Sequence, residues 1–488
     1  MIANMKAKSP FWVFLCLLVL TVTWYGRLDA SDDIEMEPLM QGFDESGESL
    51  PAGEDNQSDD ILSGFEDESQ SEVIAETDLV ESDYAVDGYA KFASAYNYAH
   101  NTPQAGETDW RGVSKLKSEL YLELNAKLQT DWRFRFSGKG SYDGIYRING
   151  YDEYTDDVRD NYETDLFLTE TWLAGSPASS LDLKVGRQIV VWGKSDNLRI
   201  TDVLNPLDLR EPGLTDIEDL RLPVFMTRLD YYFGSWNLGG FWIHEIRYNQ
   251  NPAFGSDFYP GDTPPPDQED PDEGLGETEY ALALSGTFSG WDMAFYYADI
   301  VNDAFRIENV SDSQIPELCL KHDRLDFYGT ALNVAWGNWL LKAEAAYWEG
   351  FRYVNTEDEI FSRVDLLAGL EYAGFQDMTI SLEVANRHVV DYDSRLEEFP
   401  DEIVADDTQS ALRLTRSFMN EALEITVLAI LYGSGRDDGA LQRLSLDYDI
   451  DDAWRVRIGV VAYQAGDRPP FEHVEDNDRV FLDLKYSF

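Results

Sequence analysis

The stretch that decides the fold is SKLKSELYLELNAKLQTDWRFRFSGKGSYDGIY, residues 114–146. Its residues alternate between an apolar and a polar face over 114–128 and again over 131–146, with a short turn at Gln129 and Thr130. Alternation with a period of two is typical of a β-strand, whereas an amphipathic helix repeats its apolar residues every three to four positions. Residues 114–146 are therefore predicted to form a β-hairpin.

The arms of this hairpin are unusually long. Strands in globular proteins most often have about five or six residues, and each arm here exceeds a dozen. A strand that crosses a membrane at a tilt of about 45° needs roughly 9 to 11 residues to span the hydrocarbon layer. A membrane therefore accounts for the length of the arms.

The same alternation recurs to the end of the chain and predicts eighteen strands. The predicted strands cover residues 86–98, 114–128, 131–146, 163–174, 181–192, 222–233, 236–248, 279–288, 291–301, 326–336, 339–349, 362–373, 377–388, 409–418, 422–433, 440–449, 453–464 and 478–488. Long connections follow the first seven odd-numbered strands, and short turns follow the even-numbered ones. This asymmetry is typical of outer-membrane barrels. We therefore predict an all-β fold, a transmembrane antiparallel β-barrel of about 18 strands, over residues 84–488.

A soluble β-sandwich is the main alternative, because a strand packed on a core also alternates. The strand length, the even strand count and the regular order of long and short loops all argue against it. The chain also stops on a strand, whose apolar face ends in Tyr486 and Phe488. A terminal Phe on such a face resembles the assembly signal of outer-membrane barrels, so we predict that the barrel assembly machinery inserts the protein.

The charges decide which face of each strand points inward. A Lys or Arg side chain that faces lipid at the bilayer midplane costs roughly 2 to 4 kcal/mol, so the charged faces must line the lumen. The predicted lumen-facing cations are Lys115, Lys117, Arg133, Arg135 and Lys139. The lumen is therefore predicted to be polar.

Tryptophans mark one end of the predicted barrel. Those at or beside a short turn are Trp132, Trp236, Trp291, Trp339 and Trp454. Aromatic girdles lie at the membrane–water interfaces of such barrels. We therefore predict that the short turns and these tryptophans lie on the periplasmic side.

The first 30 residues have the three parts of a secretory signal. Lys6 and Lys8 precede an uncharged apolar run over 11–25, and Ala30 is the most plausible cleavage site. An uncleaved anchor is the alternative, but the run has about 15 residues and a spanning helix needs roughly 20. Because no later stretch reaches 18 uncharged apolar residues, any further crossing is expected to be made by strands.

Residues 31–83 are predicted to form a disordered, acidic, periplasmic leader. They contain 19 Asp or Glu and no Lys or Arg, and self-repelling segments with few aromatic residues remain unfolded. Similar motifs at 39–45 and 61–67 each place Gly-Phe before an acidic pair. They are either chance matches in a biased segment or docking motifs for a periplasmic partner, with Phe43 and Phe65 as the candidate docking residues.

The composition argues against several other functions. A formal net charge of -55 over 488 residues argues against nucleic acid as a partner, because phosphate binding needs a basic face. The histidines are scattered, and Cys319 with His322 forms an isolated Cys-x-x-His that lacks half of a zinc site. No catalytic or phosphate-binding motif is present. We therefore predict no metal, no cofactor and no enzymatic activity, with a lipid-modifying enzyme as the least favoured alternative.

The connection from Trp192 to Pro223 differs from the other long loops, which are acidic. It mixes aliphatic with charged residues, and a loop of that composition is expected to pack on a surface. In a barrel that surface is the lumen, so we expect the loop to fold inward as a constriction; a loop that only caps the barrel is the alternative. The candidate lining residues are Trp192, Lys194, Asp196, Arg199, Asp202, Asn205, Asp208 and Arg210.

The same region carries a resemblance to a known family. It rests on Gly186-Arg187-Gln188, Trp192-Gly193, the run 202–208 (DVLNPLD) and Leu222-Pro223. Together these residues resemble the signature of a proteobacterial, porin-like outer-membrane β-barrel family of unknown function. Members are often associated with exporters of the resistance-nodulation-division type, so the resemblance implies a periplasmic or inner-membrane exporter as a partner. It implies no catalytic or binding residues.

Two hypotheses follow for the function. The first is an outer-membrane channel or transporter that passes a solute or lipid-like molecule through a polar lumen narrowed by the 192–223 loop. The second is a non-conducting barrel that anchors a periplasmic or export complex through its acidic leader. In both, outer-membrane lipid and lipopolysaccharide surround the barrel.

Overall fold

The computed structural model describes residues 84–103, 107–129, 132–261, 263–268, 278–309, 318–356, 359–433, 438–467, 471–472 and 474–488. All of them belong to one compact unit, residues 58–488. The predicted signal peptide and the whole predicted leader, including Phe43 and Phe65, lie outside the described residues, so the predictions for them stay predictions.

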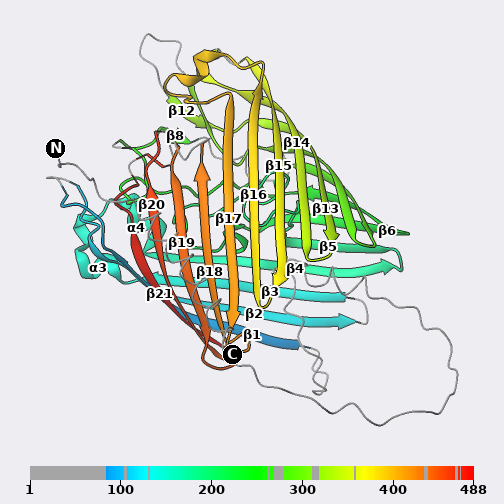
Figure 1. Cartoon of the computed structure of the whole chain (residues 1–488), viewed down its shortest axis with the longest axis horizontal. Helices are drawn as coiled ribbons and strands as arrows, with labels where there is room; N and C mark the ends of the chain where they lie inside the picture. The colour runs from blue at the N-terminus through cyan, green and yellow to red at the C-terminus, as the bar shows by residue number, and fades with distance from the viewer. Residues whose placement is uncertain are drawn as a thin grey trace, which may run out of the picture. The chain divides into compact units, whose positions relative to one another are not determined.

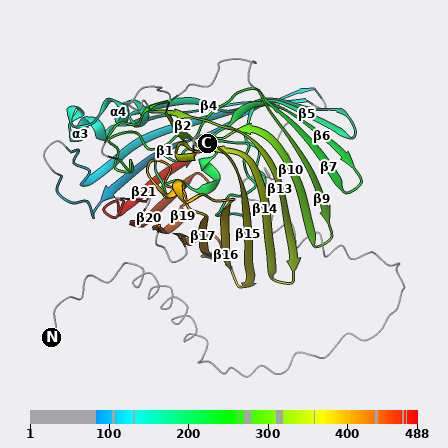
Figure 2. The same ribbon diagram turned by 90° about the horizontal axis from the view of Figure 1, so that it is seen from above.

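In the described part of the chain, eighteen antiparallel strands form one sheet that closes on itself (Figures 1 and 2). They are β1 (Tyr84–Asn97), β2 (Gly112–Gln129), β3 (Trp132–Asp143), β4 (Thr164–Ala178), β5 (Leu181–Gln188), β6 (Val224–Phe233), β7 (Trp236–Ile243), β9 (Glu279–Phe288), β10 (Trp291–Val301), β13 (Arg324–Trp336), β14 (Trp339–Arg352), β15 (Ile360–Phe375), β16 (Met378–Val390), β17 (Asp406–Phe418), β18 (Leu423–Tyr432), β19 (Ala440–Asp449), β20 (Trp454–Gln464) and β21 (Arg479–Ser487). Each strand pairs with its neighbours in sequence order around the barrel. The predicted fold class and strand number are confirmed.

The seam between the first and last strands closes the barrel. Tyr89 lies opposite Ser487 in the ladder, and Gly88 and Phe488 exchange two backbone hydrogen bonds of 3.0 Å. Gly88 is needed there, because a Cβ atom at this position would lie 2.6 Å from the carbonyl oxygen of Tyr121. The C-terminal strand is therefore part of the wall, while its role as an assembly signal stays a prediction.

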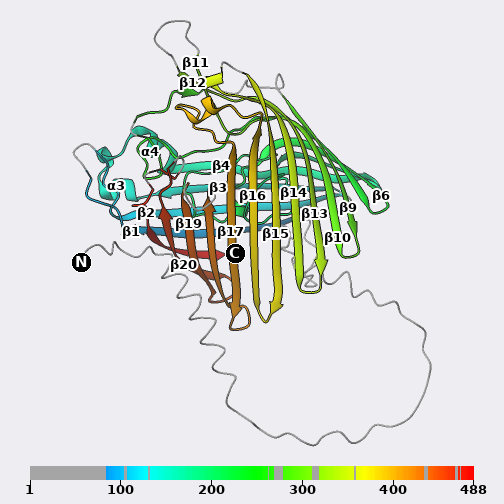
Figure 3. The same ribbon diagram turned by 45° about the horizontal axis from the view of Figure 1, so that its top comes forward.

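The connections alternate between long loops and short turns along the whole barrel, as predicted. The long loops carry the short elements of the structure, which are α3 (Ile145–Asn149), η3 (Tyr151–Glu153), α4 (Asp156–Tyr162), η4 (Ile217–Leu220), η5 (Val354–Thr356), η6 (Ser394–Glu397) and the strands β8 (Asp267–Gln268), β11 (Arg306–Asn309) and β12 (Leu318–Lys321). Of these, α3, α4, β11 and β12 lie at one end of the barrel (Figure 3). Every helix within the described residues is too short or too polar to cross a membrane.

Three predicted strands end at least three residues earlier than the alternation indicates. One is β7, which ends at Ile243 and not at 248, and side chains explain the ends of the other two. β3 stops at Asp143 because its carboxylate accepts hydrogen bonds from the backbone N–H groups of Leu116 (2.9 Å) and Ile145 (3.0 Å), which turns the chain into α3. β5 stops at Gln188, and the N–H of Val190 donates to the side chain of Asn205 (2.8 Å) instead of to a neighbouring strand. Side-chain acceptors thus replace the ladder at both places.

The outer surface of the wall is apolar. Leu120 and Leu122 on β2, Leu366 on β15 and Leu482 on β21 are each between 39% and 53% exposed, and similar side chains project from the other strands. A soluble protein rarely exposes contiguous apolar surface on that scale. Because the only solvent that suits such a band is lipid, and the wall is a closed barrel, the protein resides in the outer membrane.

An aromatic girdle surrounds the short-turn end of this band. Its tryptophans are the first residues of β3, β7, β10, β14 and β20, namely Trp132, Trp236, Trp291, Trp339 and Trp454. Several pack on a ring of the next strand: Trp339 lies 4.3 Å from Tyr372 and Trp454 lies 4.8 Å from Tyr486, measured between ring centroids. Amphipathic rings of this kind fit the membrane–water boundary.

The substitution Leu366→Arg tests the lipid-facing assignment. Placing a guanidinium on the outer surface of β15 is expected to lower the free energy of unfolding by about 2 to 4 kcal/mol. The matched control is Thr426→Arg, which introduces the same group on the lumen side of β18. Denaturant titration of the protein in lipid vesicles measures both, and equal losses in the two variants would contradict the assignment.

Candidate functional site

The connection between β5 and β6, residues 189–223, extends into the barrel and contacts the wall in two directions. Its first part, residues 192–201, binds side chains of β10, β14 and β16. Its second part, residues 210–217, binds side chains of β2, β19 and β20. We call residues 189–223 the inner loop.

Two wall carboxylates hold the first part of the inner loop. Glu383 on β16 accepts hydrogen bonds from three consecutive backbone N–H groups, those of Asp196 (2.8 Å), Asn197 (3.0 Å) and Leu198 (3.0 Å). Glu383 is only 1% exposed. Successive N–H groups that converge on one point form an anion-binding nest, so the loop backbone compensates the buried charge.

Glu344 on β14 makes the second such contact. It accepts from the N–H groups of Lys194 (2.5 Å), Ser195 (2.8 Å) and Thr201 (3.0 Å), and from the Thr201 hydroxyl (2.8 Å). Gly193 lies against this carboxylate with φ of 89°, and a Cβ atom there would be 2.8 Å from Glu344 Oε1. A glycine is thus required where the chain passes the acid.

Ion pairs add to these contacts. The Lys342 ammonium on β14 contacts Asp196 of the loop and lies 3.4 Å from Glu371 on β15. Lys194 of the loop reaches Asp292 on β10 at 2.5 Å. The loop therefore supplies one anion and one cation to partners on the same side of the wall.

Apolar packing fills the barrel on that side. The Trp192 ring stacks on Tyr296 with centroids 4.6 Å apart and meets the edge of Phe241 at 5.6 Å. Leu198 and Leu204 of the loop are buried in the same cluster. The side of the lumen near β7, β9, β10, β13 and β14 is consequently a packed core.

The base of the inner loop is closed by two side chains. Asn205 accepts from Val190 N–H (2.8 Å) and donates to the carbonyl oxygen of Leu222 (2.9 Å). Asp202 lies between two guanidinium groups, those of Arg199 (3.0 Å) and Arg221 (2.8 Å). Both residues are therefore structural parts of the loop.

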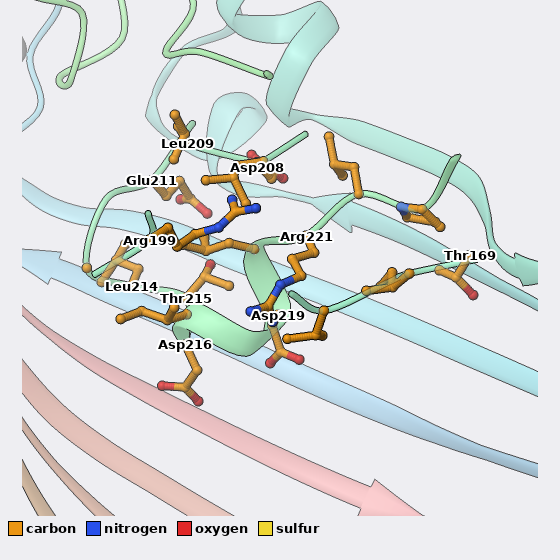
Figure 4. Close-up of a pocket in the computed structure, with 18 of the residues that line it drawn as sticks. Thr169, Arg199, Asp208, Leu209, Glu211, Leu214, Thr215, Asp216, Asp219 and Arg221 are labelled. Atoms are coloured by element: carbon orange, nitrogen blue, oxygen red, sulfur yellow. The ribbon is translucent and has the colours of Figure 1, made fainter. Parts of the chain in front are cut away.

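The second part of the inner loop is held by charges on the opposite side. Glu211 pairs with Lys115 on β2 at 2.5 Å. Asp216 contacts both Arg443 on β19, at 2.6 Å, and Arg457 on β20. Figure 4 shows Glu211 and Asp216 among the labelled residues that line the pocket.

Both acids are charged at neutral pH. Burial alone would raise the pKa of the Glu211 carboxyl, but Lys115 and Lys117 lower it to about 2. Burial acts in the same way on Asp216, and Arg443 and Arg457 lower the pKa of that carboxyl below its ordinary value.

A cavity of about 1760 Å³ remains between the inner loop and the wall, and residues of β1–β7, β9, β10 and β17–β21 line it. Among the described residues, its lining includes sixteen Lys or Arg and fourteen Asp or Glu side chains. The chain as a whole has 38 Lys or Arg and 93 Asp or Glu, so cations are concentrated in this lining. We call this space the lumen passage.

The predicted site residues are distributed unequally around the passage. The five cations predicted to face inward line it, as do five residues predicted for the constriction, Trp192, Lys194, Arg199, Asp208 and Arg210. The remaining three candidates, Asp196, Asp202 and Asn205, instead bind wall or loop partners. The functional role of all these residues stays a prediction.

Sequence reasoning missed the wall residues that hold the loop. Glu344, Glu383, Arg443 and Arg457 were not among the candidate site residues, although Glu344 and Arg457 lie on strand faces predicted to point inward. A search for acidic side chains or guanidinium groups on strand faces that point inward and otherwise hold small or apolar residues could have identified these four residues. Such a buried charge needs a partner.

The Cys-x-x-His pair has ordinary structural contacts. Cys319 Sγ lies 3.7 Å from the carbonyl oxygen of Leu320, and His322 stacks on Tyr248 and bonds the carbonyl oxygen of Asn302 through Nδ1 (2.7 Å). Among the described residues no group of three His, Cys, Asp or Glu side chains is placed to hold a metal ion.

The substitution Glu383→Gln tests the contact between wall and loop. It keeps the side-chain size but removes the charge that accepts three N–H bonds, each worth about 1.5 to 3 kcal/mol when the acceptor is charged. Amide hydrogen exchange at 196–198 is expected to accelerate at least about tenfold. Glu344→Gln is the matched control, and it should accelerate exchange at 194, 195 and 201 instead. Unchanged exchange in both variants would contradict the contacts.

Several solved structures are similar to this chain. OccAB1 of Acinetobacter baumannii is 11% identical with a TM-score of 0.50, over 85% of this chain and 98% of that chain. OccAB2 of the same organism is 10% identical (TM-score 0.48, 84% and 99% covered), and OpdK of Pseudomonas aeruginosa is 11% identical (TM-score 0.47, 83% and 98% covered). At such identity the likeness to OccAB1 shows the barrel fold alone. A search of curated proteins found no match.

The sequence itself matches a family over most of its length. Residues 96–488 match the family described as "Protein of unknown function (DUF1302)", in agreement with the resemblance found at 186–223. An exporter of the resistance-nodulation-division type as partner stays a prediction. The chain belongs to this family of outer-membrane β-barrels of unknown function.

Proposed function

We propose that the protein is a diffusion channel for small polar solutes across the outer membrane. The observation that carries this proposal is the charged cavity of about 1760 Å³ beside the inner loop. A barrel of 16 to 18 strands is wide enough to enclose an aqueous channel. A lining of mixed charge suits a hydrated solute better than a lipid tail, because apolar chains gain nothing from contact with charged groups.

The inner loop sets the width of the proposed channel. Its first part packs on the core around Trp192, and its second part reaches the opposite wall at β2, β19 and β20. The proposed route for solute is the cavity left between the loop and the wall. Contacts on both sides support a fixed loop: Glu344 and Glu383 bind its first part, and Lys115 and Arg443 bind its second. We therefore expect the inner loop to stay in place, so that the width of the proposed channel is constant.

The charge of the lining points to the kind of solute. The chain is strongly acidic, yet the lumen passage has slightly more cations than anions. Of the 93 Asp or Glu residues of the chain, only fourteen are in this lining. We propose that the route admits anionic or zwitterionic solutes, since a lining as acidic as the rest of the chain would repel them.

Cysteine modification at Thr215 tests the proposed route. Thr215 lies on the inner loop and faces the lumen passage (Figure 4). In a Cys16→Ser, Cys319→Ser background, Thr215→Cys should lose a substantial part of its single-channel conductance when a charged methanethiosulfonate is added. The control is Ser289→Cys in the exposed turn between β9 and β10, which should react without any change in current.

Two outcomes would contradict the channel. A barrel that carries no current in planar bilayers would favour the anchoring function over conduction. A conducting barrel whose current is the same before and after modification at position 215 would place the route elsewhere.

A further inference from the structure

We propose that the passage wall formed by β1–β5 is a binding surface for organic anions that carry a flat ring, such as aromatic carboxylates. The inference rests on the proposed channel, because a solute must enter the lumen passage to reach this wall. It names the solute class that the passage selects. The carrying observation is a set of aromatic rings and cations placed in register on the lumen side.

One row of this surface crosses four neighbouring strands. Tyr89 on β1 lies opposite Tyr121 on β2, Tyr121 lies opposite Lys139 on β3, and Lys139 lies opposite Phe167 on β4. The two tyrosine rings stack with centroids 5.2 Å apart, and the Lys139 ammonium lies 5.0 Å from the Phe167 centroid. The row therefore places one positive charge between aromatic rings on either side.

A second ring lies closer to the short-turn end. Trp172 on β4 is directly opposite Arg135 on β3. The Arg135 guanidinium carbon is 5.3 Å from the indole centroid, and the Lys184 ammonium from β5 is 4.5 Å from it. Both cations line the lumen passage, as does the indole ring.

A β-bulge brings both rings of β4 to the lumen side. Phe167 and Trp172 are five residues apart, so a regular strand would place them on opposite faces. The ladder between β3 and β4 shifts by one residue between Phe136 and Gly138. At that point Ser137 bonds the Thr169 hydroxyl and the carbonyl oxygen of Glu170, each at 2.7 Å. Bulges of this kind often redirect a side chain toward a functional site.

The spacing of the row fits a ring with an attached carboxylate. Neighbouring strands lie about 4.7 to 4.9 Å apart, so Tyr121 and Phe167 each lie one strand away from Lys139. A flat ring that stacks on either of them sets its carboxylate beside the Lys139 ammonium. An aliphatic acid of similar size gains the charge contact but not the stacking.

The acids of the same wall keep this binding weak. Lys139 lies 3.8 Å from Glu119, and Arg135 lies 3.1 Å from Glu123 and 3.4 Å from Glu170. These carboxylates reduce the net positive charge that a passing anion meets. A channel needs binding that is favourable enough to admit a solute and weak enough to release it.

Ligand titration of the purified full-length barrel tests this surface. The probes are benzoate, cyclohexanecarboxylate, which keeps the charge without a flat ring, and benzyl alcohol, which keeps the ring without the charge. Saturation-transfer NMR is expected to give a dissociation constant for benzoate about 2- to 10-fold lower than for cyclohexanecarboxylate, the range of one aromatic stacking contact. It should also be lower than for benzyl alcohol, which lacks the charge contact.

Variants assign the preference to this wall. Phe167→Leu combined with Trp172→Leu should lower the preference of benzoate over cyclohexanecarboxylate, because Tyr121 is then the ring that remains beside Lys139. Lys139→Gln should lower the preference of benzoate over benzyl alcohol. Trp242→Leu on the outer surface of β7 is the matched control and should leave both preferences intact. Circular dichroism and heat-modifiable migration verify that each barrel is folded.

Two results would overturn the inference: equal binding of benzoate and cyclohexanecarboxylate to the unmodified protein, or an unchanged preference in the folded Phe167→Leu, Trp172→Leu variant. Conductance is measured separately on the same preparation. A silent barrel that still prefers benzoate would overturn the proposed channel alone. A conducting barrel without the preference would overturn the binding surface alone.

Discussion

The structure depends on two buried carboxylates that bind backbone N–H groups. Glu344 and Glu383 lie on the inward faces of β14 and β16, where a charge without a partner would be costly. The inner loop supplies that compensation with six backbone N–H groups in total. Without the loop, the wall would hold two buried acids that lack these donors, and without the two acids, six loop N–H groups would lose their acceptors. Loop and wall therefore stabilise each other.

This mutual dependence explains the residues by which the family resemblance is recognised. Trp192 fills the core beside Tyr296, and Gly193 passes the Glu344 carboxylate where a Cβ atom would clash. Asp202 and Asn205 close the base of the loop through Arg221 and Leu222. The signature residues thus build the first part and the base of the inner loop. The wall for which we propose selectivity, β1–β5, lines the cavity beside it.

The fold could be predicted from sequence because the environment imposes a simple pattern on each strand. Lipid on one side and water on the other force the alternation over 114–128, and the cost of a charge in lipid fixes the direction in which Lys115 and Lys117 point. The inward loop could be expected from its aliphatic content. The wall residues that bind this loop could not be predicted. Glu344 and Glu383 lie about 150 to 190 residues from the loop in sequence, and only closure of the barrel brings them near it. The bulge in β4 could not be predicted from the sequence either, because one extra residue leaves the alternation on both sides of it nearly intact.

The central claim is that the two wall carboxylates fix the inner loop and thereby set the width of the proposed channel. Single-channel recording of the Glu344→Gln, Glu383→Gln double variant in planar bilayers tests it most directly. In this variant the loop is held mainly by the contacts of its second part with Lys115, Arg443 and Arg457. We expect its current to be larger and to fluctuate between several levels, and we expect one steady level for the unmodified barrel. A double variant with the same steady conductance as the unmodified protein would contradict the claim.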